Sequence, residues 1–83
     1  MEKILICVYV PLIEKEYDVY IPINKKIGYI KKLLIKSISE LSDNNFKINN
    51  NITLSNKLTS YVYDEEEFVY NTDIRNGVKL VIL

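Results

Sequence analysis

Residues 27–42 are the one long stretch of the chain in which apolar residues follow a helical period. Apolar positions recur at spacings of three and four, which gathers them on one stripe of a helix. The stripe holds Ile27, Ile30, Leu33, Leu34, Ile38 and Leu41, whereas Lys25, Lys26, Lys31, Lys32, Lys36 and Glu40 lie elsewhere on the wheel or just before it. We expect the helix to start at Asn24, a good N-cap residue, or just after it. The run 43–45 should end it, because asparagine tolerates the left-handed conformation of a helix C-terminus.

Strand-like patterns flank this helix on both sides. Residues 3–10 alternate, with Ile4, Ile6, Val8 and Val10 on one face and Lys3, Leu5, Cys7 and Tyr9 on the other. Residues 17–23 repeat the pattern, with Tyr17, Val19, Ile21 and Ile23 opposite Asp18 and Tyr20. Pro11 ends the first strand and Pro22 closes the second. The short charged connection 12–16 predicts that the two strands form an antiparallel hairpin.

The second half of the chain reads as shorter elements. Residues 46–51 are mostly polar and predict a surface loop, 52–55 predict a short third strand, and 61–63 predict another. The charged run 64–67 predicts a turn, and Asn76-Gly77 predicts a turn that needs positive φ. Residues 78–83 predict the last strand.

This order of elements predicts the arrangement of the sheet. A right-handed crossover through the helix places the last strand beside the first, parallel to it, at the centre of the sheet. The helical stripe then covers one face. The expected fold is α+β: a ubiquitin-like β-grasp, with a mixed sheet of four to five strands and one crossover helix.

Composition narrows the possible functions. The chain has 83 residues, enough for a single domain spanning 1–83, and its 11 basic and 11 acidic residues cancel. Without a basic excess, nucleic acid and anionic membranes are poor partners. With one cysteine and no histidine, the chain can form neither an internal disulfide nor a structural zinc site, and a histidine cannot activate a nucleophile. We therefore expect a protein that is not an enzyme and that has no catalytic residue, cofactor or metal.

No stretch of the sequence is long and apolar enough to span a bilayer, which takes about 20 residues. The apolar start of the chain is short and is followed by Pro11 and a charged loop, so we interpret it as a strand and not as a signal peptide. We expect a cytoplasmic protein that does not insert into the membrane.

Three stretches carry a resemblance to a known family: residues 17–22, residues 27–41, and residues 73–83 with their Asn-Gly turn and terminal apolar strand. The chain resembles ubiquitin in element order and, more specifically, the YukD/EsaB-like proteins associated with type VII (WXG100) secretion in Gram-positive bacteria. The resemblance implies an accessory or regulatory interaction module of that machinery. Its partner would be a cytosolic domain of a membrane secretion component, which would hold the protein at the membrane periphery.

Two other functions remain open. Ubiquitin and the sulfur-carrier proteins act through a flexible tail ending in Gly-Gly, whereas this sequence ends Val81-Ile82-Leu83. A sulfur-carrier or protein-modifier role is therefore disfavoured. The other alternative is a small structural protein that forms homo-oligomers through the exposed face of its sheet.

The outer face of the sheet is the candidate site. One face of the sheet should point toward the helix through Ile4, Ile6, Val8, Tyr17, Val19, Ile21, Leu80 and Ile82. The pleat then sends an apolar, tyrosine-bearing set of residues to the opposite face, and a single helix leaves that face without an obvious cover. We expect it to dock a protein partner through Leu5, Cys7, Tyr9, Tyr20, Val81 and Leu83. The alternative is that these residues are simply good strand formers. Cys7 is interpreted as a small apolar filler and the run 64–67 as a solvated turn, not as a nucleophile and a metal site. The helix lysines are interpreted as a solvated face and not as a docking surface.

Overall fold

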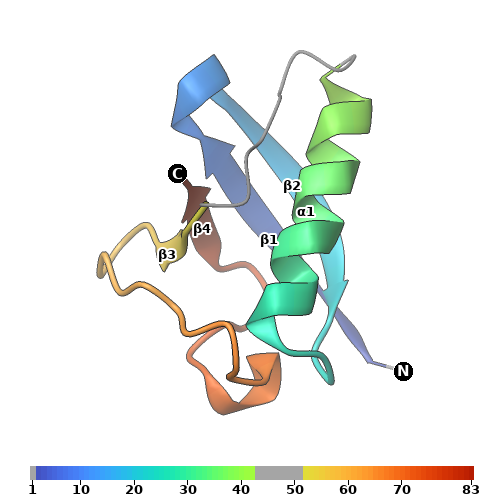
Figure 1. Ribbon diagram of the computed structural model, residues 1–83, viewed down its shortest axis with the longest axis vertical. Coiled ribbons are helices and arrows are strands. Elements are labelled where there is room, and N and C mark those ends of the chain that lie inside the picture. Colours follow the sequence, from blue (N-terminus) through green and yellow to red (C-terminus); the bar gives the residue numbers. More distant parts are fainter. Residues whose placement is uncertain (1, 43–51) are drawn as a thin grey trace.

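The computed structural model describes residues 2–42 and 52–83. Its elements in chain order are β1 (Lys3–Val10), a 3₁₀ turn η1 (Pro11–Ile13), β2 (Lys15–Pro22), α1 (Ile27–Leu41), β3 (Leu54–Asn56), a second 3₁₀ turn η2 (Val69–Asn71) and β4 (Lys79–Ile82). The helix packs across one face of the sheet (Figure 1). The predicted helix end at 43–45 and the predicted loop 46–51 lie outside the described residues.

The sheet has four strands in the order β2-β1-β4-β3, with β1 and β4 parallel at its centre and the other pairs antiparallel. This confirms the predicted hairpin, crossover and central placement of the last strand. The hairpin pairs Lys3 with Pro22 and Val10 with Lys15, so β2 begins two residues before its predicted start. Glu14 closes the connection at φ 52°, a left-handed conformation that a non-glycine residue adopts at some cost.

The core lies between the sheet and α1, as the alternation predicts. Buried side chains come from every second residue of the central strands and from the helical stripe, joined by anchors from the second half of the chain. They are Ile6, Val8, Val10, Ile21, Ile27, Ile30, Leu34, Ile38, Leu54, Tyr63, Val69, Ile74, Leu80 and Ile82.

Two positions of the helix differ from the prediction. Leu41 is 58% exposed although its spacing puts it on the stripe. Leu41 is the last residue of the helix. Periodicity predicts which side of the helix a residue faces, but it does not predict whether the sheet extends far enough to cover that residue. Lys31 is the reverse case, with only 8% of its surface exposed. Its ammonium lies 3.0 Å from a Glu65 carboxylate oxygen, and this pairing compensates the burial of the charge.

The start of α1 is capped by the backbone of another segment. The helix begins just after Asn24, which agrees with the expected start, but Lys26 and not Asn24 is the N-cap residue, and it makes no side-chain capping bond. Instead, the amide of Ile27 donates to the carbonyl of Glu67 (2.8 Å) and the amide of Gly28 donates to that of Glu65 (3.0 Å). The acidic turn 64–67 thereby satisfies donors that a helix leaves unpaired at its N-terminus.

The edge of β3 is covered by an irregular segment. The amide of Asn56 donates to the carbonyl of Tyr61, and that of Tyr63 to the carbonyl of Leu54. Residues 61–63 were predicted to be a strand but form only an isolated bridge between Val62 and Ser55. The pairing extends no further because Ser60, at φ 62°, turns the backbone immediately before it. The third strand is Leu54–Asn56 instead of 52–55, and the last is Lys79–Ile82 instead of 78–83.

The two glycines should respond oppositely to alanine. A Cβ at Gly28 would meet Glu65 at 3.5 Å, an ordinary contact, whereas Gly77 has φ +89°. We expect Gly28→Ala to raise the free energy of unfolding by about 0.5 kcal/mol and Gly77→Ala to lower it by about 1 kcal/mol or more. Urea denaturation of both variants measures this. A destabilised Gly28→Ala would mean that the docking of the turn 64–67 needs bare backbone at this position.

Candidate protein-docking face

The predicted docking residues lie on the side of the sheet that faces away from α1. Leu5, Cys7, Tyr9 and Val81 are half-buried, whereas Tyr20 and Leu83 are 65% and 66% exposed. The residues between them on the strands are core residues, so the pleat divides the two faces as expected. Whether this face docks a partner stays a prediction.

The pairing register brings some of these residues together and separates others. Leu5 is the partner of Tyr20 across β1 and β2, and Tyr9 is the partner of Val81 across β1 and β4. These make two apolar pairs. Leu83 lies past the end of β4, where its amide and carbonyl exchange hydrogen bonds with Thr53. The predicted set is therefore not one continuous apolar patch.

A charged row divides the two apolar pairs. Cys7 lies between its two cross-strand partners, Asp18 on β2 and Lys79 on β4. The amide of Lys57 in turn donates to the carbonyl of Lys79. Acidic groups thus lie on the β2 side of the face and basic groups on the β4 side. The alternation of the strand already placed Asp18 on the same face as Tyr20. The presence of Lys57 on this face could not be predicted, because it depends on how β3 pairs.

Lys57 also shields part of the apolar surface. Its ammonium lies 5.0 Å from the centre of the Tyr9 ring and 3.7 Å from a carboxylate oxygen of Glu16. The side chain therefore reaches from the end of β3 across β4 to β1 and β2. Both members of this ion pair are about half-exposed, and a pair of that kind contributes at most about 1 kcal/mol.

The thiol of Cys7 is not activated by its surroundings. Burial raises its pKa, and the carboxylates of Glu16 and Asp18 raise it further, against the opposing effect of Lys79. A higher pKa means less thiolate at neutral pH, and the thiolate is the nucleophile. This agrees with the interpretation of Cys7 as a filler.

This environment predicts slow alkylation of Cys7. At pH 8 the iodoacetamide reaction of the folded protein should be slower than that of the same protein in urea. Asp18→Asn should speed the reaction of the folded protein because it removes a nearby negative charge, and Lys79→Gln should slow it because it removes the positive one. Mass spectrometry measures the rates. Equal rates in the folded variants would show that burial alone controls the thiol.

An acidic hollow of about 250 Å³ is lined by Tyr61, Glu67, Asn71, Thr72 and Asp73, none of which belongs to the predicted docking set. The Tyr61 hydroxyl donates to Glu67 at 3.5 Å, and the negative charge of Glu67 is the main cause that raises the pKa of Tyr61. Across residues 2–42 and 52–83, no group of three or more His, Cys, Asp or Glu side chains could hold a metal ion.

A buried polar network anchors the turn after β3. The side-chain amide of Asn56 donates to the hydroxyl oxygen of Tyr63 (3.2 Å), whose own proton is donated to Asp73. The carbonyl oxygen of the same Asn56 side chain accepts bonds from the amides of Leu58 (2.8 Å) and Thr59 (3.2 Å). Both ends of a buried side chain are thus satisfied, which ties this exposed turn to the interior.

The Tyr63 phenol should make the protein sensitive to alkali. Burial and the bond to Asp73 raise the pKa of Tyr63 far above its ordinary value of 10. Its contribution to stability is complete below pH 10, where both the folded and the unfolded chain keep the proton, and falls above it because only the unfolded chain then loses the proton.

We expect Tyr63→Phe to lower the free energy of unfolding at pH 7 by about 1–2 kcal/mol, because Asn56 and Asp73 lose a partner. The difference between wild type and variant should shrink above pH 10. Urea denaturation at pH 7 and at several values above 10 measures both effects. A difference independent of pH would contradict the raised pKa.

In the part of the chain that the structure describes, no helix is long and apolar enough to cross a membrane.

Comparisons with known proteins identify the fold. No protein-family model matches the sequence, and no curated protein matches it. Among solved structures, the ubiquitin-like domain of the Mycobacterium tuberculosis type VII secretion system protein EccD1 has a TM-score of 0.79 at 10% identity, with 100% of this chain and 99% of that one covered.

Two further structures agree with this. A chain of the MycP5-free ESX-5 inner membrane complex has a TM-score of 0.80 at 13% identity, over 100% of this chain and 21% of that one. Caldiarchaeum subterraneum ubiquitin has a TM-score of 0.68 at 11% identity, over 98% of this chain and 91% of that one. At such identities the likeness establishes the fold alone. The chain has the ubiquitin-like β-grasp fold that its element order predicts.

Proposed function

We propose that this protein is a non-catalytic interaction module that docks a protein partner on the outer face of its sheet. The observation that supports this most directly is the sheet face that α1 does not cover. The helix α1 packs on one side of the sheet (Figure 1), and the other side carries the pairs Leu5–Tyr20 and Tyr9–Val81, of which Tyr20 is exposed and the other three are half-buried. Tyrosine-bearing apolar surface framed by charge is typical of protein interfaces.

The partner we propose is a cytosolic domain of a membrane component of a type VII (WXG100) secretion machinery. Two observations support this finer assignment. The sequence resembles the YukD/EsaB-like proteins, and the fold matches the ubiquitin-like domain of a type VII secretion protein and a chain of an inner membrane complex. The protein would then be a cytoplasmic accessory or regulator, held near the membrane by its partner. A sulfur-carrier role and a homo-oligomer are the competing functions.

An affinity pull-down from the native host tests the proposal. N-terminally tagged protein and its Val81→Asp variant are incubated with detergent-solubilised lysate, and bound proteins are identified by mass spectrometry. We expect wild type to recover membrane secretion components and the variant to lose most of them. A charge placed at the centre of an apolar contact costs several kcal/mol of binding, roughly a hundredfold in affinity or more.

Leu41→Asp is the matched control. It makes the same charge change at an exposed apolar position on the helix, away from the sheet face. Binding should survive it. Equal recovery by Val81→Asp would remove the sheet face as the docking site. Recovery of an adenylating enzyme, or of adducts at Leu83, would favour the carrier function, and a concentration-dependent mass in light scattering would favour the homo-oligomer.

A further inference from the structure

A hollow of about 570 Å³ opens where β3 ends and β4 begins, and none of the predicted docking residues lines it. Asn56, Lys57, Leu58, Gly77, Val78 and Lys79 line it, and its walls are mostly apolar. Its size falls within the range of ligand-binding pockets, which is about 300–1,000 Å³. It is shallow and open, which suits a side chain of a protein segment better than an enclosed small molecule.

Leu58 is unusually exposed for a large apolar residue. It is 91% exposed, more than any other large apolar side chain in the described residues. The turn that carries it is not loosely attached. Asn56 holds the amides of Leu58 and Thr59, and its backbone carbonyl accepts from the amide of Ser60 at 2.8 Å. A leucine held out in an organised turn loses little conformational freedom when a partner covers it.

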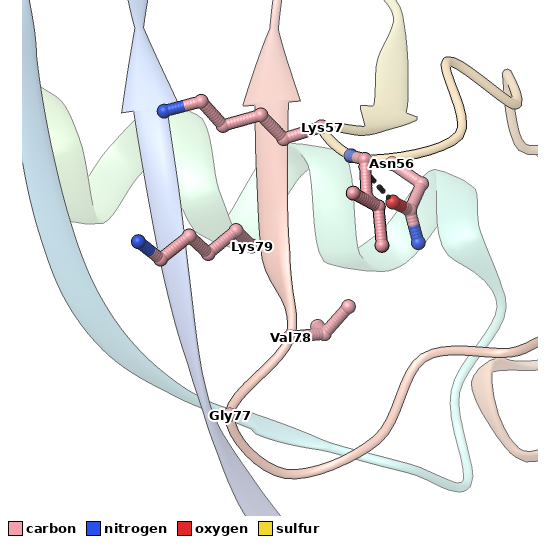
Figure 2. Close-up of a pocket in the computed structure, with 6 residues that line it drawn as sticks. Asn56, Lys57, Gly77, Val78 and Lys79 are labelled. Atoms are coloured by element: carbon pink, nitrogen blue, oxygen red, sulfur yellow. Dashed lines mark hydrogen bonds between the residues drawn. The ribbon is translucent and has the colours of Figure 1, made fainter.

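Two lysines border the hollow on the side of the docking face. Figure 2 shows Lys57 extending across β4 and Lys79 extending from β4, both toward β1, while Val78 points to the other side of β4. Among the described residues, the ammonium of Lys57 contacts a half-exposed carboxylate of Glu16 and the ring of Tyr9. Lys79 has no ion-pair partner among the described residues. An incoming carboxylate therefore meets one unpaired ammonium and a second that is easily recruited.

The geometry points to a docking site for a segment of a partner protein in which an apolar side chain lies next to one or more carboxylates. The apolar side chain would lie against Leu58 and Val78, and the carboxylate would bind over Lys57 and Lys79. Charge complementarity selects this occupant. A basic segment is disfavoured by the same two ammonium groups. The inference rests on the proposed function, since it names the chemistry of a segment bound at this edge of the docking face.

An NMR titration of the full chain tests the site with defined probes. The probes are acetyl-Gly-Asp-Leu-Asp-Gly-amide and two matched peptides, one with lysines for both aspartates and one with serine for leucine. We expect the first peptide to cause saturable shifts at the amides of Leu58, Gly77 and Lys79 at millimolar concentration. The serine peptide should bind about tenfold more weakly, which corresponds to the loss of one good contact.

Variants separate the two halves of the site. Leu58→Ser should weaken the Asp-Leu-Asp peptide about tenfold, and Lys79→Glu should do the same. The double variant Lys57→Glu, Lys79→Glu should prefer the Lys-Leu-Lys peptide. All of these positions are at the surface, and the dispersion of the same spectra reports whether each variant is folded.

Several outcomes would overturn the inference: no saturable shift at these amides, equal binding of all three peptides, or an unchanged preference in the double variant. Shifts of the same amides on simple concentration of the protein would assign the hollow to a second copy of this chain. If the peptides fail while Val81→Asp still loses the partner in the pull-down, this site is wrong and the proposed function stands. If Val81→Asp retains the partner, the outer face fails independently of the peptide result.

Discussion

Burial of one helical stripe against one face of a sheet is the interaction on which the rest of this structure depends. Ile27, Ile30, Leu34 and Ile38 have no exposed surface, and neither do Val8 and Leu80 of the two central strands. In a chain this small, one core has to supply the apolar burial that offsets the entropy of folding. The crossover that brings β4 beside β1 places the helix over that core. The same geometry leaves the opposite face of the sheet without contact to α1, and the proposed docking site lies on that face.

That uncovered face is organised by cross-strand register. The pleat decides that Leu5, Cys7 and Tyr9 point outward, but the register decides what lies next to each of them. The register pairs Leu5 with Tyr20 and Tyr9 with Val81, and it places the row Asp18, Cys7 and Lys79 between these two pairs. The outcome is a face with apolar contacts, an acidic side and a basic side. If the proposed partner binds there, the apolar pairs would contribute affinity and the charges would favour one orientation of the partner.

The second half of the chain has little regular structure but supplies the contacts that complete the first half. The turn 64–67 caps the helix with its backbone, and Glu65 pairs with the buried Lys31. Residues 61–63 cover the edge of β3, and Tyr63 joins Asn56 to Asp73 in a buried network. The contacts of the turn 64–67 with α1 join segments far apart in the sequence, whereas the side-chain contacts of Tyr63 span at most 10 residues. The network around Asn56 holds the turn that carries the exposed Leu58, although this turn is neither a strand nor a helix.

Local pattern in the sequence was enough to predict β1, the hairpin, α1, the Asn76-Gly77 turn and the order of the central strands. Hydrophobic periodicity and turn residues are properties of short stretches of sequence. The right-handedness of the crossover then leaves few ways to arrange the strands in the sheet. The outward set from Leu5 to Leu83 also followed from alternation. Other features depended on contacts that no local pattern contains: the helix cap from Glu65 and Glu67, the burial of Lys31, the exposure of Leu41, and the reach of Lys57 over Tyr9. Each of these features depends on which segments lie near one another in space, and packing and register decide that, so only the tertiary structure could show them.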